Sequence, residues 1–231
     1  KISNFSKYLI ILIASLFIYL FYLLIPILYD KTWIQTRIES KLINEFKLNI
    51  STSSGIFYRI LPAPHFLIKD SKILIDDDGK KKPIAEIKDL KVFLSQADLF
   101  NKKRMNIKKL VINNANFSFL RSDLKLLNNL KNKKFSNKKI EINNSNIFFK
   151  DNSEEIISII KIDKTVAYFD DENLLNLLNI NGEVFKMPFN LNFKYQTNTN
   201  GYHKINFSSK PLRLNISNVS IKKKKINFWK K

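Results

Sequence analysis

The sequence has no cysteine, only four glycines and only two histidines among its 231 residues. Without cysteine, neither a disulfide framework nor a thiolate metal site can form. Four scattered glycines provide no glycine-rich loop that would cradle a phosphate group. His65 and His203 each stand alone in a strand-like context, so we expect both to face solvent. We therefore predict a protein that is not an enzyme and that has no cofactor and no metal.

Acidic residues are also scarce, since 20 Asp and Glu stand against 40 Lys and Arg, for a net charge of +20. A charge of this sign favours nucleic acid or an anionic membrane surface as partner, and nucleic acid would require a cytoplasmic domain. The codons of an AT-rich genome would produce the same bias toward Lys, Asn, Ile and Phe. Lysine occupies nearly every polar strand position, which is typical of a solvated face. We predict no nucleic-acid partner.

Residues 8–29 form a run of apolar and aromatic side chains without a charge. A helix of this length, at 1.5 Å per residue, crosses the roughly 30 Å hydrocarbon core of a bilayer. A cleaved signal peptide would need a shorter apolar core and a small-residue cleavage site, and the sequence has neither. We predict a first region, 1–30, with a short N-terminal stub and a transmembrane helix. Lysines flank both ends, so the charge count leaves the orientation open.

An amphipathic helix is expected next, at 31–47. Ile34, Ile38, Leu42 and Phe46 follow one another at steps of four, with charged residues between them, which places the apolar side chains on one helix face. That face would cap a core or lie on the membrane surface.

The remaining region, 48–231, has a hydrophobic period of two in short runs broken by Asn, Asp, Gly and Pro. Helical interruptions are predicted at 95–100 and 122–132, and Asn200-Gly201 predicts a hairpin turn. The fold class is therefore mainly β: an N-terminal transmembrane helix, then a curved, bulged antiparallel sheet that forms an open groove, with a few short helices.

One spacing occurs four times within this sheet. Each copy has an isoleucine, an Asp or Asn two residues later, and an apolar residue five after the isoleucine. In an unbroken strand, residues five apart face opposite sides, because successive side chains alternate. The copies begin at Ile68, Ile112, Ile142 and Ile216, at irregular separations that exclude a short-period solenoid.

A β-bulge at each copy would restore the phase and turn both apolar residues to one side. Asn and Asp tolerate the positive φ that such a corner often demands. The alternative is an ordinary turn between two short strands. On the bulge interpretation, the corner residues are Asp70, Asn114, Asn144 and Asn218. The predicted apolar face consists of Ile68, Ile73, Ile112, Phe117, Ile142, Ile147, Ile216 and Ile221.

The order of landmarks has a familiar form. A glycine precedes a proline-containing strand with an apolar-x-apolar-x-Asp ending, a second strand and a leucine-containing turn lead to a third strand, and a later glycine precedes a Pro-Phe strand. These landmarks are Gly55, Pro62 or Pro64, Phe66, Ile68, Asp70, Val92, Leu94, Leu99, Ile107, Leu110, Ile112, Gly182, Pro188 and Phe189. In this order the chain resembles the N-terminal region of bacterial AsmA-like proteins. It is shorter than typical members and begins at Lys1, so we expect its ends to have been set by truncation.

The resemblance implies a single-pass protein of the bacterial inner membrane, with its C-terminal domain in the periplasm. It implies a β-groove that holds phospholipids or other acyl lipids, a role in phospholipid transport to the outer membrane and in envelope assembly, and envelope proteins as further partners. An open apolar face would shelter acyl chains from water at about 0.8 kcal/mol per CH₂. Two alternatives stay open: the face packs as a closed core, or the domain is a scaffold that binds a protein through its sheet edges.

Overall fold

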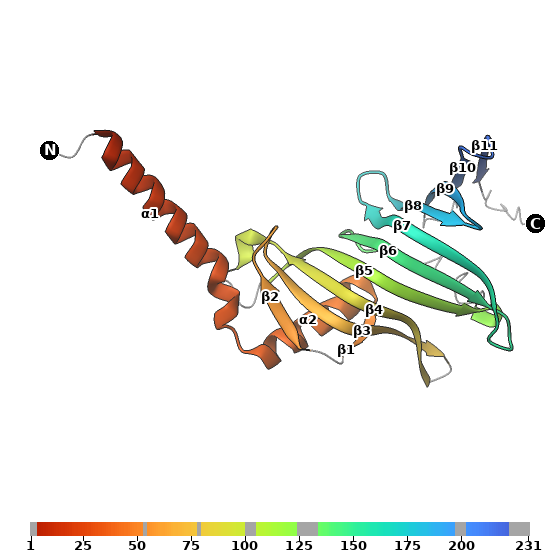
Figure 1. The fold of residues 1–231 in the computed structure, drawn as a ribbon, viewed down its shortest axis with the longest axis horizontal. Helices are drawn as coiled ribbons and strands as arrows, with labels where there is room; N and C mark the ends of the chain where they lie inside the picture. The colour runs from red at the N-terminus through yellow and green to blue at the C-terminus, as the bar shows by residue number, and fades with distance from the viewer. Residues whose placement is uncertain are drawn as a thin grey trace, which may run out of the picture.

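The computed structural model describes residues 4–52, 55–77, 80–99, 105–123, 134–196 and 202–221. The chain begins with a long apolar helix, α1 (Asn4–Leu24), and a 3₁₀ turn, η1 (Ile25–Leu28). Residues Phe5–Leu28 are long and apolar enough to cross a membrane. α1 projects away from the rest of the protein (Figure 1).

A second helix, α2 (Lys31–Phe46), follows at once, as its periodicity predicts. Its N-cap Asp30 accepts a hydrogen bond from the backbone N of Trp33 at 2.8 Å. It ends at Lys47, which adopts the left-handed conformation of a C-cap at φ 57°. The four predicted apolar residues of α2 are all buried.

Eleven strands form a single sheet in the order β1-β3-β4-β5-β6-β7-β8-β9-β10-β11, with β2 also paired to β3. Consecutive strands pair antiparallel except β5 and β6, which are parallel, so the sheet is mixed rather than wholly antiparallel as expected. The strands are β1 (Asn49–Thr52), β2 (Ile56–Arg59), β3 (His65–Asp77), β4 (Lys80–Leu94), β5 (Ile107–Leu120), β6 (Lys139–Lys150), β7 (Ile156–Asp170), β8 (Leu175–Val184), β9 (Met187–Gln196), β10 (Tyr202–Ser209) and β11 (Leu214–Ile221).

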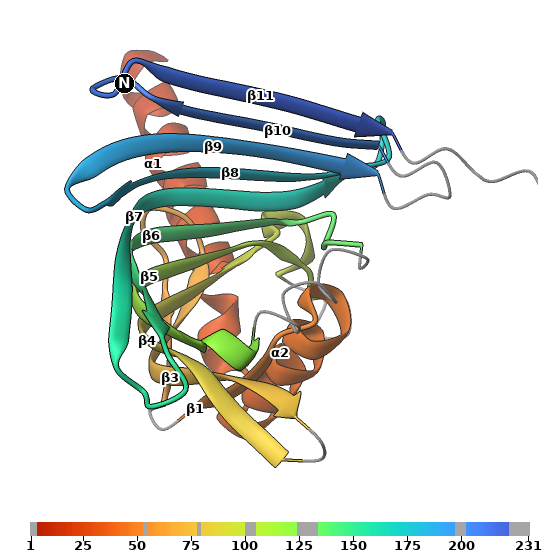
Figure 2. The same cartoon turned by 90° about the vertical axis from the view of Figure 1, so that its right-hand side faces the viewer.

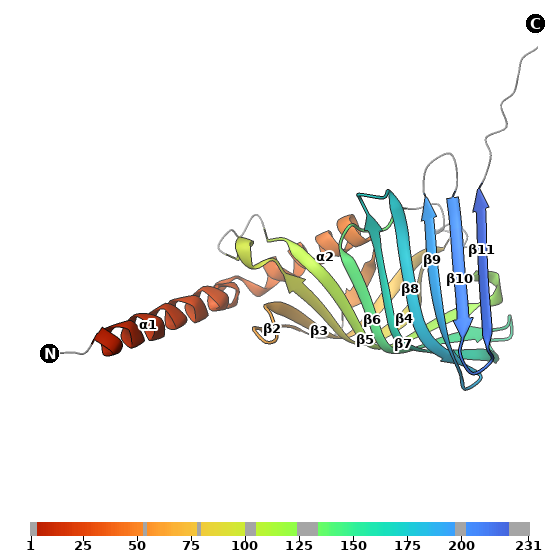
Figure 3. The same cartoon turned by 90° about the horizontal axis from the view of Figure 1, so that it is seen from above.

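The sheet curls around α2, which lies against the concave face of its first strands (Figure 2). We call this concave side the inner face. Seen from above, the strands from β5 to β11 continue the curve beyond the helix (Figure 3). The hydrophobic core joins α2 to β1, β3, β4 and β5.

A row of residues with irregular backbone crosses the sheet where the corner residues were predicted, and we call this row the crease. Asp70, Asn114 and Asn144 have φ of 48°, 54° and 47°. The pairs that flank them place Lys88 of β4 and Asp163 of β7 in the same cross-strand row. In five neighbouring strands, β3 to β7, the alternation of inner-face and outer-face residues therefore shifts by one position at the same row. Inner-face residues lie on both sides of the row in each strand.

The predicted mechanism, an extra residue at every corner, is wrong for β3 to β6. Their registers run through the row without a shift, because each neighbour changes phase at the same level. Within this row the extra residue appears only where β7 meets β8, at Asp163, between the pairs Ile162–Gly182 and Lys164–Asn181. The other register shifts lie away from the row, next to Ile73, Phe93 and Phe149. Gly182 is required there, since a Cβ would lie 2.3 Å from the carbonyl oxygen of Lys161.

The prediction of a corner at Asn218 is also wrong. β11 pairs with β10 in continuous register, and Asn218 lies opposite Ile205 within a regular ladder. Asn218 is not among the described residues with positive φ. Because β8 to β11 lie beyond the bulge at Asp163, no change of phase reaches them, and the spacing at Ile216 is a chance match to the motif.

The smaller elements are partly described. The predicted turn at 95–100 contains the 3₁₀ turn η2 (Gln96–Asp98). Of the predicted helix at 122–132, the structure describes only the 3₁₀ turn η4 (Arg121–Asp123) at its start. The remainder of that segment and the Asn200-Gly201 turn lie outside the described residues, but β9 and β10 pair as the predicted hairpin requires.

We predict that Asn144→Ala destabilises the protein by about 1 kcal/mol, because alanine tolerates the left-handed conformation less well than asparagine. Asn144→Gly should have little effect, since glycine adopts positive φ freely. Asn218→Ala is the matched control in a regular strand. The measurement is thermal unfolding of the detergent-solubilised full chain. Equal effects of Asn144→Ala and Asn218→Ala would contradict a strained corner at Asn144.

Candidate functional site

The inner face carries an apolar row that crosses nine strands. Directly paired residues share a face of the sheet, so a chain of such pairs traces one side continuously. Thr165 of β7 is the single polar member of this row. From β3 to β11 its residues are Ile68, Leu90, Ile112, Ile142, Thr165, Ile180, Leu191, Phe207 and Ile216.

The row is sealed at one end and open at the other. Ile68 and Ile112 are 1% and 2% exposed, whereas Ile216 is 50% exposed. The difference comes from α2, whose buried side chains share one hydrophobic cluster with β3, β4 and β5. Beyond β6 the described residues include no helix that packs into this core. We call β3–β5 the closed half of the inner face and β6–β11, which no described helix covers, its open half. Ile162, Thr165 and Phe169 of β7 are nevertheless buried within the open half.

The eight predicted face residues divide between these halves. Ile68, Ile73 and Ile112 lie in the closed core, and Phe117 and Ile142 pack against its margin. Ile147 pairs with Phe117 and so lies on the same face, at the start of the open half. Ile216 lies at the exposed end of the row. The prediction that Ile221 belongs to this face is wrong by the register of the backbone, because Ile221 pairs with Tyr202 in a regular strand and so belongs to the face opposite that of Ile216.

Sequence reasoning missed most of the open half. Its largest contributors come from β8, β9 and β10, where the alternation of apolar residues was plain but no corner motif drew attention to it. They are Leu178, Ile180, Phe189, Leu191, Phe193, Ile205 and Phe207. All except Ile205, which is 41% exposed, are partly buried.

The described inner face of β6–β11 contains no Lys, Arg, Asp or Glu, according to the strand registers. This is notable in a chain of which 26% is charged. The opposite, outer face of the same strands carries lysines, glutamates and asparagines. On that face, Asn143 Nδ2 donates to Asn113 Oδ1 at 3.0 Å, and Asn146 Nδ2 donates to Asn116 Oδ1 at 3.1 Å. The sheet is therefore strongly amphipathic.

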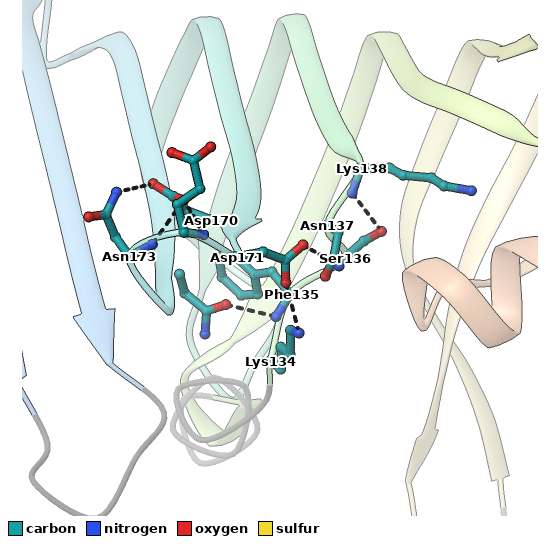
Figure 4. A network of polar contacts seen from close by, with 10 residues as sticks. Lys134, Phe135, Ser136, Asn137, Lys138, Asp170, Asp171 and Asn173 are labelled. Carbon is teal, nitrogen blue, oxygen red and sulfur yellow. Dashed lines mark hydrogen bonds and ion pairs between the residues drawn. The ribbon is translucent and has the colours of Figure 1, made fainter. Parts of the chain in front are cut away.

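The segment that leads into β6 contacts one end of the open half (Figure 4). The backbone N of Phe135 donates to Asn176 Oδ1 at 2.8 Å, and its ring packs edge-on against Tyr195 at 5.8 Å between centroids. Asn176 and Tyr195 are almost completely buried, and burial raises the pKa of Tyr195. An apolar ligand on this face would therefore meet aromatic protein groups at this end of the strands.

The same segment is fixed to the β7–β8 turn by polar contacts (Figure 4). Lys134 Nζ lies 3.3 Å from Asp171 Oδ1 and 3.9 Å from the ring centroid of Phe169. Asn137 Nδ2 donates to the other carboxylate oxygen of Asp171 at 2.5 Å. The turn that contains the acidic run at 170–172 thus anchors residues 134–137, which lead into β6.

Among the described residues, no group of three or more acidic, histidine or cysteine side chains could hold a metal ion. The prediction that His65 faces solvent is wrong, because it is 3% exposed and stacks on Phe93 at 4.9 Å. Burial holds the pKa of His65 below its ordinary value, against a hydrogen bond to Ala63 that raises it. His203 is partly buried on the inner face and stacks on Phe193 and Tyr195.

Comparison with known proteins yields no assignment, since no protein-family model and no curated protein matches the chain. The geometry of the amphipathic sheet is therefore the ground for a functional proposal.

The boundary between the two halves of the inner face is held by Glu45 of α2. It accepts hydrogen bonds from Lys41 at 2.7 Å and from Lys138, the residue before β6. Burial alone would raise the pKa of Glu45, but the hydrogen bonds and charges of Lys138 and Lys41 hold it below the ordinary value of 4.5. Its stabilising contribution is therefore complete above that pH and is lost as the pH falls through the folded-state pKa.

We predict that Glu45→Gln lowers stability at neutral pH by on the order of 1 kcal/mol and makes the melting temperature less sensitive to acid. Glu86→Gln is the matched control, since Glu86 pairs with Lys72 at 2.9 Å while both side chains are more than half exposed. Melting curves of the solubilised protein between neutral pH and about pH 4 measure both. If the melting temperature of Glu45→Gln fell with pH as steeply as that of the unmodified protein, Glu45 would not stabilise the contact between α2 and Lys138.

Proposed function

We propose that this protein is a membrane-anchored, non-enzymatic lipid-binding protein that holds acyl chains on the open half of its inner face. The observation that carries the proposal is the charge-free apolar surface of β6–β11, with no described helix packed into it. A contiguous exposed apolar surface on a protein marks a binding site for an apolar partner. α1 supplies the membrane anchor.

The chemistry of the face suits an acyl chain better than a polar ligand. The sheet backbone is paired along the strands, so few free backbone donors are available there. The side chains are aliphatic and aromatic, and each buried CH₂ of a bound chain would contribute about 0.8 kcal/mol. The β6–β11 strands have five spacings of about 4.8 Å, which gives a face about 24 Å wide.

As part of the same proposal, the chain is an AsmA-like protein of the bacterial inner membrane. Its domain would lie in the periplasm and take part in phospholipid transport to the outer membrane and in envelope assembly. The features that support this are the order of the elements, α1 followed by α2 and a curved sheet with an open face. The closed half at β3–β5 would not carry lipid, because α2 occupies it.

A second candidate function is supported by β11, which pairs with β10 and with no other described strand. β11 is the last strand in the order, and its eight residues include no charged side chain. Charged residues, especially lysine, normally protect an exposed edge from pairing with another chain. An unprotected edge suits a scaffold that binds a protein partner by adding a strand.

Photocrosslinking on β9 distinguishes the two functions. We predict that a photoreactive amino acid at Leu191 or Phe193 captures phospholipid acyl chains, while the same group at Asn192, on the outer face, captures several-fold less. The full chain is crosslinked in native membranes and adducts are identified by mass spectrometry. Leu191→Lys should remove lipid that copurifies with the protein, and Asn192→Lys should retain it. Protein adducts alone, or equal lipid capture at all three positions, would refute the lipid-binding proposal.

The location is tested separately through the absence of native cysteine. In bacterial cells with a permeabilised outer membrane, we predict that a membrane-impermeant maleimide labels Asn179→Cys, on the outer sheet face. Ser3→Cys, before α1, should react only after the inner membrane is lysed. The reverse pattern would place the sheet in the cytoplasm, refute the periplasmic role and restore nucleic acid as a partner for the basic domain.

A further inference from the structure

The last turn of α1 and the residue that follows η1 are hydrogen-bonded directly to the sheet domain. Tyr58 of β2 donates to the carbonyl oxygen of Leu23 at 2.6 Å. Tyr29 donates to the carbonyl oxygen of Leu99 at 2.5 Å, and Tyr22 donates to that of Gln96. Burial raises the pKa of Tyr58 to about 12, so this phenol remains a donor at any physiological pH. The candidate span therefore meets the domain without a flexible linker.

These contacts fix the depth of β2 relative to the membrane. About 20 helical residues cross a 30 Å hydrocarbon core, and the candidate span Phe5–Leu28 has 24. Its last four residues, the η1 turn, therefore extend to the level of the lipid headgroups. β2 contacts both Leu23 and the neighbourhood of η1, so it lies at the same level.

Large apolar side chains are exposed on η1, on β2 and in the loop just after β2. Leu28 and Leu61 are each 83% exposed, Ile27 is 58% exposed and Phe57 is 50% exposed. Ile27 and Leu28 continue the exposed apolar surface of α1, and Phe57 joins Ile27 around a common cavity. An aromatic ring at the boundary between headgroups and acyl chains is typical of membrane-interface proteins.

The cavity itself has the chemistry of a phosphate headgroup site. It has a volume of about 280 Å³ and lies between η1, the start of α2, β2 and β3. Two cationic residues, Lys31 and Arg59, line it together with apolar and tyrosine side chains, and no acidic residue does. Lys and Arg are the side chains that bind phosphate oxygens by charge-assisted hydrogen bonds.

We propose that η1, β2 and the loop after β2 form a second membrane contact, in which Phe57, Leu61 and Leu28 enter the leaflet and Lys31 and Arg59 bind lipid phosphate groups. The partner is the phospholipid leaflet around α1, and anionic lipids bind it best. This contact holds the β2 edge of the sheet against the bilayer. It goes beyond the proposed acyl-chain face and is independent of it, because no residue of β6–β11 takes part.

Single-cysteine labelling of the full chain tests the contact directly, since no native cysteine interferes. An environment-sensitive fluorophore is placed at position 57 or 61, and at the exposed apolar controls Leu174 and Phe185, on the two turns that flank β8. The protein is reconstituted into phosphatidylcholine vesicles whose lipids carry a nitroxide near the headgroup. A label at Ala14 reports that α1 spans the bilayer.

The labels at 57 and 61 should be blue-shifted and quenched by the nitroxide, while those at 174 and 185 should resemble a label in water. Labels at all four positions that resemble water, with the Ala14 label inside the bilayer, would overturn the proposal. An Ala14 label outside the bilayer would also overturn the proposal, because the membrane contact requires α1 to span the bilayer.

The charge component has its own measurement. Adding phosphatidylglycerol to the vesicles should increase quenching at position 61, and the double variant Lys31→Gln/Arg59→Gln should lose this increase. Lys210→Gln/Arg213→Gln, on the β10–β11 turn, removes the same charge elsewhere and should keep it. If both double variants respond alike, lipid phosphate is not bound at Lys31 and Arg59.

Discussion

The apolar inner face of the sheet depends on a shift in the alternation of inward and outward side chains, which neighbouring strands make at the same row. A strand that shifted its apolar residues alone would break the hydrogen-bond ladder with both neighbours. Because β3 to β7 all shift in one row, the ladder resumes in the same register on the far side. Ser145 repairs the interruption locally, since its hydroxyl accepts from the backbone N of Ala115 at 3.0 Å and donates to the carbonyl of Asn143 at 2.8 Å.

This shared shift creates an apolar face that one helix cannot cover. α2 has 16 residues, which makes it about 24 Å long. The strands β3 to β11 have eight spacings of about 4.8 Å, so their face extends about 38 Å. Even a helix laid straight across the strands would leave about a third of them uncovered. α2 lies next to β1 and therefore covers β3 to β5, which form the closed half. The strands of the same apolar row that α2 does not reach form the open half.

Much of this could be predicted from the sequence, because it depends on local patterns. The helix at 31–47, the strand alternation and the corners at Asp70, Asn114 and Asn144 are each visible within a few residues. The parallel pairing of β5 with β6 was not predicted, although the 30-residue separation of two copies is the register offset between Ile112 and Ile142. Tertiary packing decides which of two equally apolar segments α2 covers. The sequence therefore could not show that Ile68 is buried and Ile216 is exposed.

The false corner at Asn218 has the same cause. An Asn between apolar residues is common in a chain this rich in Asn and Ile, and only the neighbouring strands decide whether the backbone bends there. At Asn144 both neighbours are creased, whereas at Asn218 the paired strand β10 is regular. The Ile-x-Asn/Asp spacing therefore indicates a corner only where the neighbouring strands have a corner at the same level.

The net charge of +20 leads to a similar distinction between composition and position. A codon bias would add lysine to every strand face alike, so the overall charge alone identifies no partner. The described inner face of β6–β11 nevertheless carries no charged residue, while lysines lie on the outer face of the same strands. A closed core would explain this exclusion at β3–β5, where α2 removes the face from water. At β6–β11 no described helix does so, and the absence of charged residues from this partly exposed face is the observation on which the proposed acyl-chain site rests.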